Sequence, residues 1–146
     1  NVKNLIINVV YNNQGKALEK NINIECDLES IDSYLDKDKI SQVIVNLLSN
    51  AIRYTNNGGK IFISSYKENN NLKIQFKDNG IGIPKENIKY IFERFYRVDE
   101  SRSKNTGGIG VGLTIVKSII DLHQGTIEVR SELNKGSEFI VILPNL

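Results

Sequence analysis

Residues 60–77, KIFISSYKENNNLKIQFK, read as two strands, Lys60–Lys67 and Leu72–Lys77, around the turn Asn69-Asn70-Asn71. β-Branched and aromatic residues favour strands, and asparagine favours turns, so this stretch predicts an antiparallel hairpin. The hairpin bears on the fold class because its strands are joined directly, without a helix between them. Such pairing favours an α+β fold over one in which single strands alternate with helices.

Two helices and a strand are predicted before this hairpin. Apolar residues at helical spacing predict an amphipathic helix from Val2, weakened at its far end by Gly15. A strand follows at Ile22–Leu28, and Asp36 or Asp38 can cap a second helix. We expect residues 56–59, Asn-Asn-Gly-Gly, to end that helix, whose apolar stripe is Ile40, Val43, Ile44, Leu47, Leu48 and Ala51.

Two helices and another hairpin are predicted after it. Pro84 suits the first turn of a short helix marked by Ile88, Ile91, Phe92 and Phe95. Residues 96–109 are polar and rich in Gly and Ser, so they are expected to form a long functional loop. A helix over Ile115–Ile120 with Gly125 as its cap precedes strands at Thr126–Ser131 and Glu138–Leu143, which Pro144 ends. Residues 1–146 are therefore predicted to form one α+β domain, a two-layer sandwich with helices on one face of a mixed sheet.

Composition excludes several classes of protein. The 146 residues are 40% apolar, enough for one core, and the net charge of +2 gives no reason to expect nucleic acid as a partner. Cys26 is the only cysteine, so no intramolecular disulfide can form. No run approaches the roughly 20 apolar residues of a membrane span, and these residues show no signal-peptide pattern. We expect a soluble, cytosolic domain, and its start on a helical pattern without Met suggests an excised fragment.

The segment Asp78-Asn79-Gly80-Ile81-Gly82-Ile83 leaves the second strand of the hairpin and leads to Pro84. Glycines allow a ligand to approach the backbone closely. A carboxylate at a strand end can accept a hydrogen bond from an exocyclic amine, such as the adenine 6-amino group, whereas a guanine 6-oxo group is no donor. Alone, however, Asp-Asn-Gly is also a common turn.

Two further groups of residues suit phosphate and metal chemistry. Asn46, Asn50 and Arg53 share one polar stripe of the second helix, where amide oxygens can bind Mg²⁺ and the guanidinium can meet phosphate. A solvated helix edge would explain the same spacing. Residues 107–113, GGIGVGL, open a helix whose N-terminus can hold an anion, although a flexible hinge would also be glycine-rich. No P-loop motif is present, and no strand precedes these glycines as a Rossmann fingerprint requires.

Together these elements resemble the ATP-binding catalytic domain of bacterial two-component sensor histidine kinases, of the Bergerat type shared with DNA gyrase and large heat-shock chaperones. Residues 42–55, QVIVNLLSNAIRYT, match the N box of that family, and residues 78–83 match its first Gly box. Residues 92–99, FERFYRVD, match the F box, and residues 107–113 followed by TIVK match the second Gly box. The likeness continues through His123–Thr126 and Gly136–Phe139, so it covers nearly the whole chain in family order.

The resemblance implies roles for individual residues. Asn50 would bind Mg²⁺ with Asn46 close by, and these two with Arg53 would form the catalytic set. Asp78 would read the adenine amine beside Tyr54 and Ser137. Residues 96–110 would form a lid over ATP. The remaining expected contacts to the nucleotide are Gly80, Gly82, Ile83, Arg97, Lys104, Gly108, Gly110, Val111, Gly112 and Leu113, with Arg102 a further lid cation.

The resemblance also implies partners. The phosphoryl acceptor would be a histidine on a separate dimerisation hairpin of the same kinase, and a response-regulator receiver domain would take the group onward. His123, the only histidine, falls where the family has a structural one, so the 146-residue chain is expected to bind Mg-ATP as a monomer but not to phosphorylate itself. Its place would be the cytoplasmic side of a membrane-anchored kinase.

The sequence departs from the family pattern at two positions and leaves other functions open. Ile109 stands where Thr or Ser is usual, and Arg53 where Lys is common. A hydrolytic clamp of the gyrase or chaperone type would place a glutamate base at position 46, where this chain has Asn46. A serine kinase that captures a sigma factor conflicts with the F box. A non-catalytic nucleotide-binding module remains a further alternative.

Overall fold

The computed structural model describes residues 1–93, 96 and 112–145. The helices are α1 (Val2–Glu19), α2 (Lys37–Tyr54) and α4 (Gly112–Leu122), with a short 3-10 helix η1 (Lys85–Tyr90). The strands are β1 (Asn23–Leu28), β2 (Lys60–Glu68), β3 (Asn71–Asp78), β4 (Thr126–Glu132) and β5 (Gly136–Pro144).

The five strands form one mixed sheet in the order β1-β2-β3-β5-β4. β1 runs parallel to β2, and the other neighbouring pairs are antiparallel. The central β2–β3 hairpin predicted from residues 60–77 is present, and Asn69 and Asn70 form its turn with φ of 50° and 63°. Asparagine tolerates this left-handed backbone better than most residues, which explains the asparagine-rich turn.

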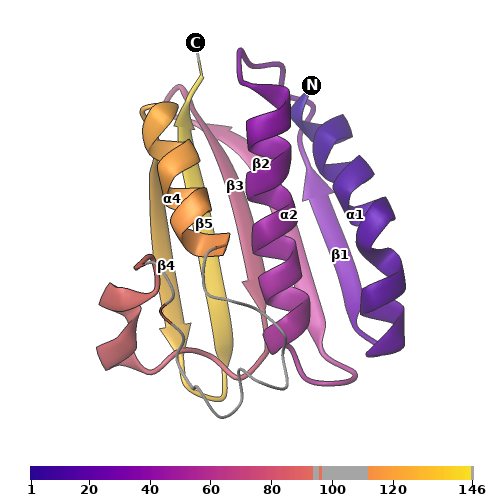
Figure 1. Cartoon of the computed structure of the whole chain (residues 1–146). Helices are drawn as coiled ribbons and strands as arrows, with labels where there is room; N and C mark the ends of the chain where they lie inside the picture. Colours follow the sequence, from indigo (N-terminus) through magenta and orange to yellow (C-terminus); the bar gives the residue numbers. More distant parts are fainter. Residues whose placement is uncertain (94–95, 97–111, 146) are drawn as a thin grey trace.

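Helices α1, α2 and α4 all lie on the same face of the sheet (Figure 1). The inward residues of β2 and β3, among them Ile61, Ile63 and Phe76, are buried beneath them. The apolar stripe predicted for α2 is fully confirmed, because all six of its residues are buried. The α+β sandwich with a mixed sheet and helices on one face is therefore confirmed.

Local signals predicted the element ends less well than the elements themselves. α1 continues past Gly15 to Glu19, because Ala17 in that last stretch is buried against the core. The segment after Pro84 forms a 3-10 helix. At the end of α4 it is Gln124 that adopts the positive φ expected of a cap, one residue before the predicted Gly125. Gly125 is needed for space instead, since a Cβ there would lie 2.5 Å from the carbonyl oxygen of Ile142.

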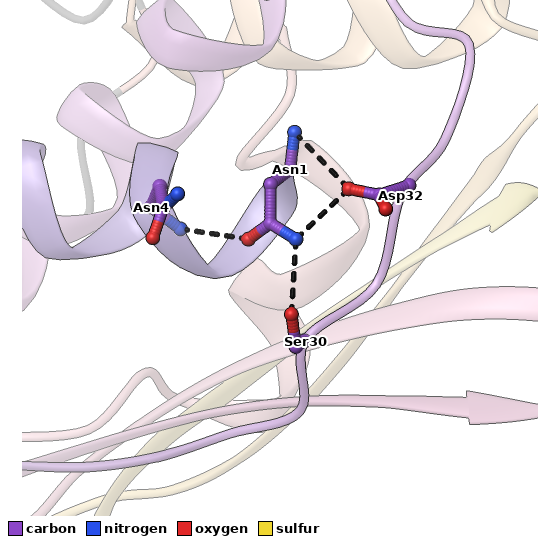
Figure 2. A network of polar contacts seen from close by, with 4 residues as sticks. All are labelled: Asn1, Asn4, Ser30 and Asp32. Atoms are coloured by element: carbon purple, nitrogen blue, oxygen red, sulfur yellow. Dashed lines mark hydrogen bonds and ion pairs between the residues drawn. The ribbon is translucent and has the colours of Figure 1, made fainter.

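The start of α1 is fastened to the segment that follows β1 (Figure 2). The Asn1 side chain accepts a hydrogen bond from the Asn4 backbone N–H at 3.2 Å, as a helix N-cap does. Its amide nitrogen donates to Ser30 Oγ at 3.0 Å and to Asp32 Oδ1 at 2.9 Å. The neighbouring Val2 N–H donates to the Ile31 carbonyl at 2.9 Å, so both side chain and backbone hold this end of the helix.

Lys20 links the end of α1 to the end of α2. Its ammonium donates to the carbonyl oxygens of Ile52 and Arg53 at 2.7 and 3.1 Å. The last carbonyls of a helix lack partners within the helix and carry its negative dipole end, so a cation there is stabilising. Partial burial lowers the pKa of Lys20.

Within the described residues, no helix is long and apolar enough to cross a membrane.

Replacement of Lys20 by Met is expected to lower the free energy of unfolding by about 1 kcal/mol, because the α2 carbonyls lose a charged donor while the aliphatic stem is kept. Urea unfolding measures the change. Lys16→Met, at an exposed position in the last turn of α1, is the matched control. An equal loss in the two variants would show that the contact with α2 contributes nothing.

Candidate functional site

One row of residues crosses the sheet under the helices near the end of β3. Asp78 pairs with Ser137 of β5 on one side and with Ile61 of β2 on the other. Ser137 in turn pairs with Ser131 of β4. Directly paired residues in a sheet point to the same face, so Ser131, Ser137 and Asp78 are neighbours on the helix-covered side.

The Asp78 carboxylate is held by the backbone through one oxygen. Its Oδ1 accepts hydrogen bonds from the Gly80 N–H at 2.9 Å and from the Ser137 N–H at 3.3 Å. Within the described parts of the chain, no group donates to Oδ2. The half-buried Asp78 thus keeps its Oδ2 as an acceptor that a ligand could use.

Burial raises the pKa of the Asp78 carboxyl above its ordinary value, and the hydrogen bonds from Gly80 and Ser137 oppose this rise in part. Taking a carboxylate out of water disfavours its charged form, whereas N–H donors favour it. Here desolvation has the larger effect. The free carboxylate is thus an acceptor that a ligand donor would satisfy.

The loop after Asp78 is pressed against the end of α2. The Ile81 N–H donates to the Tyr54 carbonyl at 3.0 Å. A Cβ on Gly80 would lie 2.2 Å from that same oxygen, so only glycine fits this approach. Asn79 ties the loop to β2, because its Oδ1 accepts from the Lys60 N–H at 2.8 Å.

The far end of the loop is held by the β4–β5 hairpin. Gly82 has φ of 70°, which favours glycine, and a Cβ there would lie 2.1 Å from the Glu132 carbonyl oxygen. The Ile83 N–H donates to Ser131 Oγ at 2.7 Å. The Ser131 hydroxyl also lies 2.9 Å from the Gly136 carbonyl and 2.8 Å from Ser137 Oγ.

Asn46, Asn50 and Arg53 lie along the second half of α2, and Asn46 faces the start of α4. The Asn46 amide nitrogen donates to the Gly112 carbonyl at 3.4 Å, and its side-chain oxygen has no donor among the described residues. Arg53 approaches Asn50 Oδ1 at 3.5 Å, a long and weak contact. The predicted stripe therefore places Asn46 beside the first residue of α4, and brings the Asn50 amide oxygen near the Arg53 guanidinium.

The first turn of α4 contributes backbone N–H groups that have no partner within the helix, as at any helix N-terminus. Gly112 and Leu113 belong to this turn and are partly exposed. Thr114 fixes its position, because its hydroxyl donates to the Phe92 carbonyl at 2.9 Å. The turn therefore suits an anion that also contacts α2.

Several predicted site residues lie outside the described residues: Arg97, Arg102, Lys104, Gly108, Gly110 and Val111. Among residues that are described, no group of three or more His, Cys, Asp or Glu side chains could hold a metal ion. The amide oxygens of Asn46 and Asn50 are groups of the type that a hard cation accepts, and a cation bound there would need further oxygens from a phosphate and from water.

His123 has a structural role. Its Nδ1 lies 2.8 Å from the Ile119 carbonyl, and its Nε2 accepts from the Asp36 N–H at 3.3 Å. A ring that accepts at Nε2 and donates at Nδ1 is neutral, and both nitrogens are engaged. His123 thus joins the end of α4 to Asp36, the N-cap of α2.

Sequence reasoning missed three residues that position this site: Ser131, Asn79 as an anchor to β2, and Lys20. Asn79 was noted only as part of a motif, because its bond to Lys60 joins residues 19 positions apart. Ser131 lies in a predicted strand, where nothing in the sequence marks its register with Ser137. Lys20 acts over a distance of more than thirty residues along the chain, which no local pattern can reveal.

Comparisons with known proteins identify the family of this chain. Residues 35–146 match the family described as histidine kinase-, DNA gyrase B-, and HSP90-like ATPase. Sensor histidine kinase YclK of Bacillus subtilis is 40% identical over 133 residues, which are 90% of this chain and 28% of YclK. The chain therefore spans less than a third of that relative.

Solved structures give the same assignment. The catalytic domain of histidine kinase ThkA has a TM-score of 0.86 and 31% identity, over 99% of this chain and 93% of that one. ThkA in complex with response regulator protein TrrA has a TM-score of 0.81 and 29% identity, over 100% of this chain and 41% of that one. The chain belongs to the histidine kinase-, DNA gyrase B- and HSP90-like ATPase family and, within it, to the catalytic domains of sensor histidine kinases.

Replacement of Gly80 by Ala is expected to destabilise the fold by about 2 kcal/mol, because the new Cβ would overlap the Tyr54 carbonyl oxygen. Gly15→Ala is the matched control, since a Cβ there meets nothing within 4 Å and alanine favours a helix by about 0.5–1 kcal/mol. Thermal and urea unfolding measure both. Equal stabilities of the Gly80 variant and the parent would refute the close approach.

Replacement of Asp78 by Asn is expected to stabilise the ligand-free domain at neutral pH. The amide oxygen can still accept from Gly80 and Ser137, while the desolvated charge is removed. Because the folded-state pKa of Asp78 is raised, the parent gains stability as pH falls through that pKa and loses it as pH rises. The stability gap between variant and parent should therefore narrow in acid. A variant less stable than the parent at pH 7 would contradict this sign.

Proposed function

We propose that this domain binds Mg-ATP and donates the γ-phosphoryl group to a histidine on the separate dimerisation hairpin of a sensor kinase. A response-regulator aspartate then receives the group. The observation that carries the proposal is the contact between the loop after β3 and the end of α2. Asp78 lies on the loop side of this contact, and the Asn46–Asn50–Arg53 stripe lies on the helix side. That arrangement suits a ligand with an amine at one end and phosphates at the other.

Adenine is the base that fits the Asp78 end. Oδ1 is engaged by two backbone donors, so Oδ2 is the oxygen that accepts from the 6-amino group. A 6-oxo group at the same place would set two acceptors against each other, with the cost of leaving them unpaired. Tyr54 lies beside this end through its contact with Ile81, and Gly80, Gly82 and Ile83 shape the loop.

The phosphates belong at the other end, between α2 and α4. Mg²⁺ would be held by Asn50, with Asn46 close by, and would supply charge neutralisation of the phosphate oxygens when bound. Arg53 can turn from its long contact with Asn50 to a phosphate oxygen. The N–H groups of Gly112 and Leu113 add donors from the first turn of α4.

Residues 96–110 form the lid in this proposal. Arg97 and Lys104 would add positive charge near the phosphates, with Arg102 a further candidate. Gly108, Gly110 and Val111 would bring backbone N–H groups to the same oxygens, as a glycine-rich segment before a helix can.

The acceptor and the regulator are partners of this domain in the proposal. Both ring nitrogens of His123 are occupied within the fold, which supports an acceptor on another segment. The relatives are sensor kinases, and ThkA has been solved with its response regulator. We therefore place the domain on the cytoplasmic side of a membrane-anchored kinase, as a monomer when isolated.

Phosphoryl transfer tests the proposal directly. The purified 146-residue domain with ATP and Mg²⁺ is expected to label an added dimerisation hairpin of the same kinase with an acid-labile phosphoryl group. It should not label itself.

Asp78→Asn should lose both ATP binding and labelling, with affinity weaker by roughly 10- to 100-fold. Many turnovers of hydrolysis without the hairpin would favour an ATPase clamp, and tight binding without transfer would favour a non-catalytic nucleotide module.

Replacement of Asn50 by Ala is expected to remove the dependence of ATP binding on Mg²⁺. The loss of one metal ligand worth about 1.4 kcal/mol or more weakens Mg-ATP binding roughly tenfold or more. Calorimetry across a magnesium titration measures the effect. Asn12→Ala, at an exposed position on α1, is the matched control. Equal magnesium responses of the Asn50 variant and the parent would refute the assignment.

A further inference from the structure

Ser131 and Ser137 form a hydroxyl pair next to Asp78. Their Oγ atoms are 2.8 Å apart, and either hydroxyl can be the donor. The direction of this bond decides what Ser137 offers to a ligand. If Ser137 donates to Ser131, only its lone pairs remain. If Ser137 accepts from Ser131, its own O–H is free to donate elsewhere.

The surroundings of Ser131 fix the direction. Its oxygen already accepts from the Ile83 N–H at 2.7 Å, and the Gly136 carbonyl at 2.9 Å can accept its proton. When Ser131 donates to Gly136, Ser137 can donate to the second lone pair of Ser131, and all three contacts are hydrogen bonds. When Ser131 donates to Ser137 instead, the contact with Gly136 is lost.

The second arrangement also leaves the Ser137 proton without a partner. Ser137 is 9% exposed, and within the described residues the only hydrogen bond of its hydroxyl is the one to Ser131. One net hydrogen bond changes an equilibrium by roughly 2- to 12-fold. The first arrangement therefore dominates, and Ser137 Oγ presents lone pairs.

Ser137 and Asp78 then present acceptors side by side. They are paired in the sheet, and the Ser137 N–H donates to Asp78 Oδ1. The free Asp78 oxygen and the Ser137 hydroxyl oxygen together match a group with two N–H donors. An exocyclic amine on a purine is such a group, and a 6-oxo group is not.

We propose that Ser131 determines the specificity of the site for 6-amino over 6-oxo purines, by fixing the Ser137 hydroxyl as an acceptor. The inference rests on the proposed function, since it concerns the same nucleotide site. Ser131 is a positioning residue: it touches Ser137, Gly136 and Ile83, and acts on the ligand only through Ser137.

ATP and inosine triphosphate carry the same phosphates and differ only in the purine 6-group and the proton that the 6-oxo form has at N1, and the Ser137→Ala background separates the contribution of the Ser137 hydroxyl from that of N1. Dissociation constants of both are measured by calorimetry for the parent, Ser131→Ala, Ser131→Thr, Ser137→Ala and the double alanine variant. Ser118→Ala, at an exposed position on α4, is the matched control.

In Ser131→Ala the Ser137 hydroxyl can rotate and donate to a 6-oxo group. The preference for ATP over inosine triphosphate should fall by roughly 3- to 10-fold, the scale of one hydrogen bond. Ser131→Thr keeps the hydroxyl and should keep the preference. In the Ser137→Ala background the same change at Ser131 should have no further effect on the ratio, because its route to the ligand is gone.

The outcomes are separable. Two results would overturn the inference even if the parent prefers ATP. One is that Ser131→Ala leaves the ratio of ATP to inosine triphosphate affinity unchanged. The other is that Ser131→Ala lowers this ratio equally in the parent and in the Ser137→Ala background. Should Ser131→Ala fail to fold, Ser137→Ala alone decides, since an unchanged ratio in that variant also overturns it. A parent that binds neither nucleotide would overturn the proposed function, and the inference with it.

Discussion

The contact between the end of α2 and the loop after β3 is the constraint on which the site depends. Gly80 lies so close to the Tyr54 carbonyl that any side chain would overlap it, and the Ile81 N–H bonds to the same oxygen. α2 carries the amide and guanidinium groups, whereas the loop follows the Asp78 carboxylate. This one backbone contact therefore fixes the distance between the two ends of the candidate site. A shift of the loop would change both ends together.

The groups that support this contact come from distant parts of the chain. Lys20 holds the last carbonyls of α2 from the end of α1, and Ser131 holds Ile83 from β4. His123 and the N-cap Asp36 join the other end of α2 to α4. α2 is thus fastened at both ends by polar bonds and along its length by its buried stripe. Such a helix is a rigid base for ligand groups that must keep their geometry.

The sequence predicted most of the fold because its signals are local. The stripe of α2 follows the helical period, and Asn69 and Asn70 suit the turn between β2 and β3. The order of strands and the row from Ser131 to Asp78 depend on pairing between segments far apart, which no local pattern encodes. The same limit explains why Lys20 and Ser131 were missed, whereas Asp78 and Asn50 lie in short motifs that the sequence itself displays. Gly125 was predicted for its backbone freedom, but the structure uses its lack of a side chain against Ile142.

Asp78 shows how the fold accepts a local cost in the candidate site. Burial raises the pKa of its carboxyl, so the charged form is less favourable here than in water. Two backbone N–H groups offset part of this cost, yet both act on one oxygen. A further pair of donors on the second oxygen would stabilise the free domain but would leave nothing to attract a ligand. In the proposed function a bound amine would relieve this unfavourable solvation of Asp78, and selectivity for an amine would follow from the same imbalance.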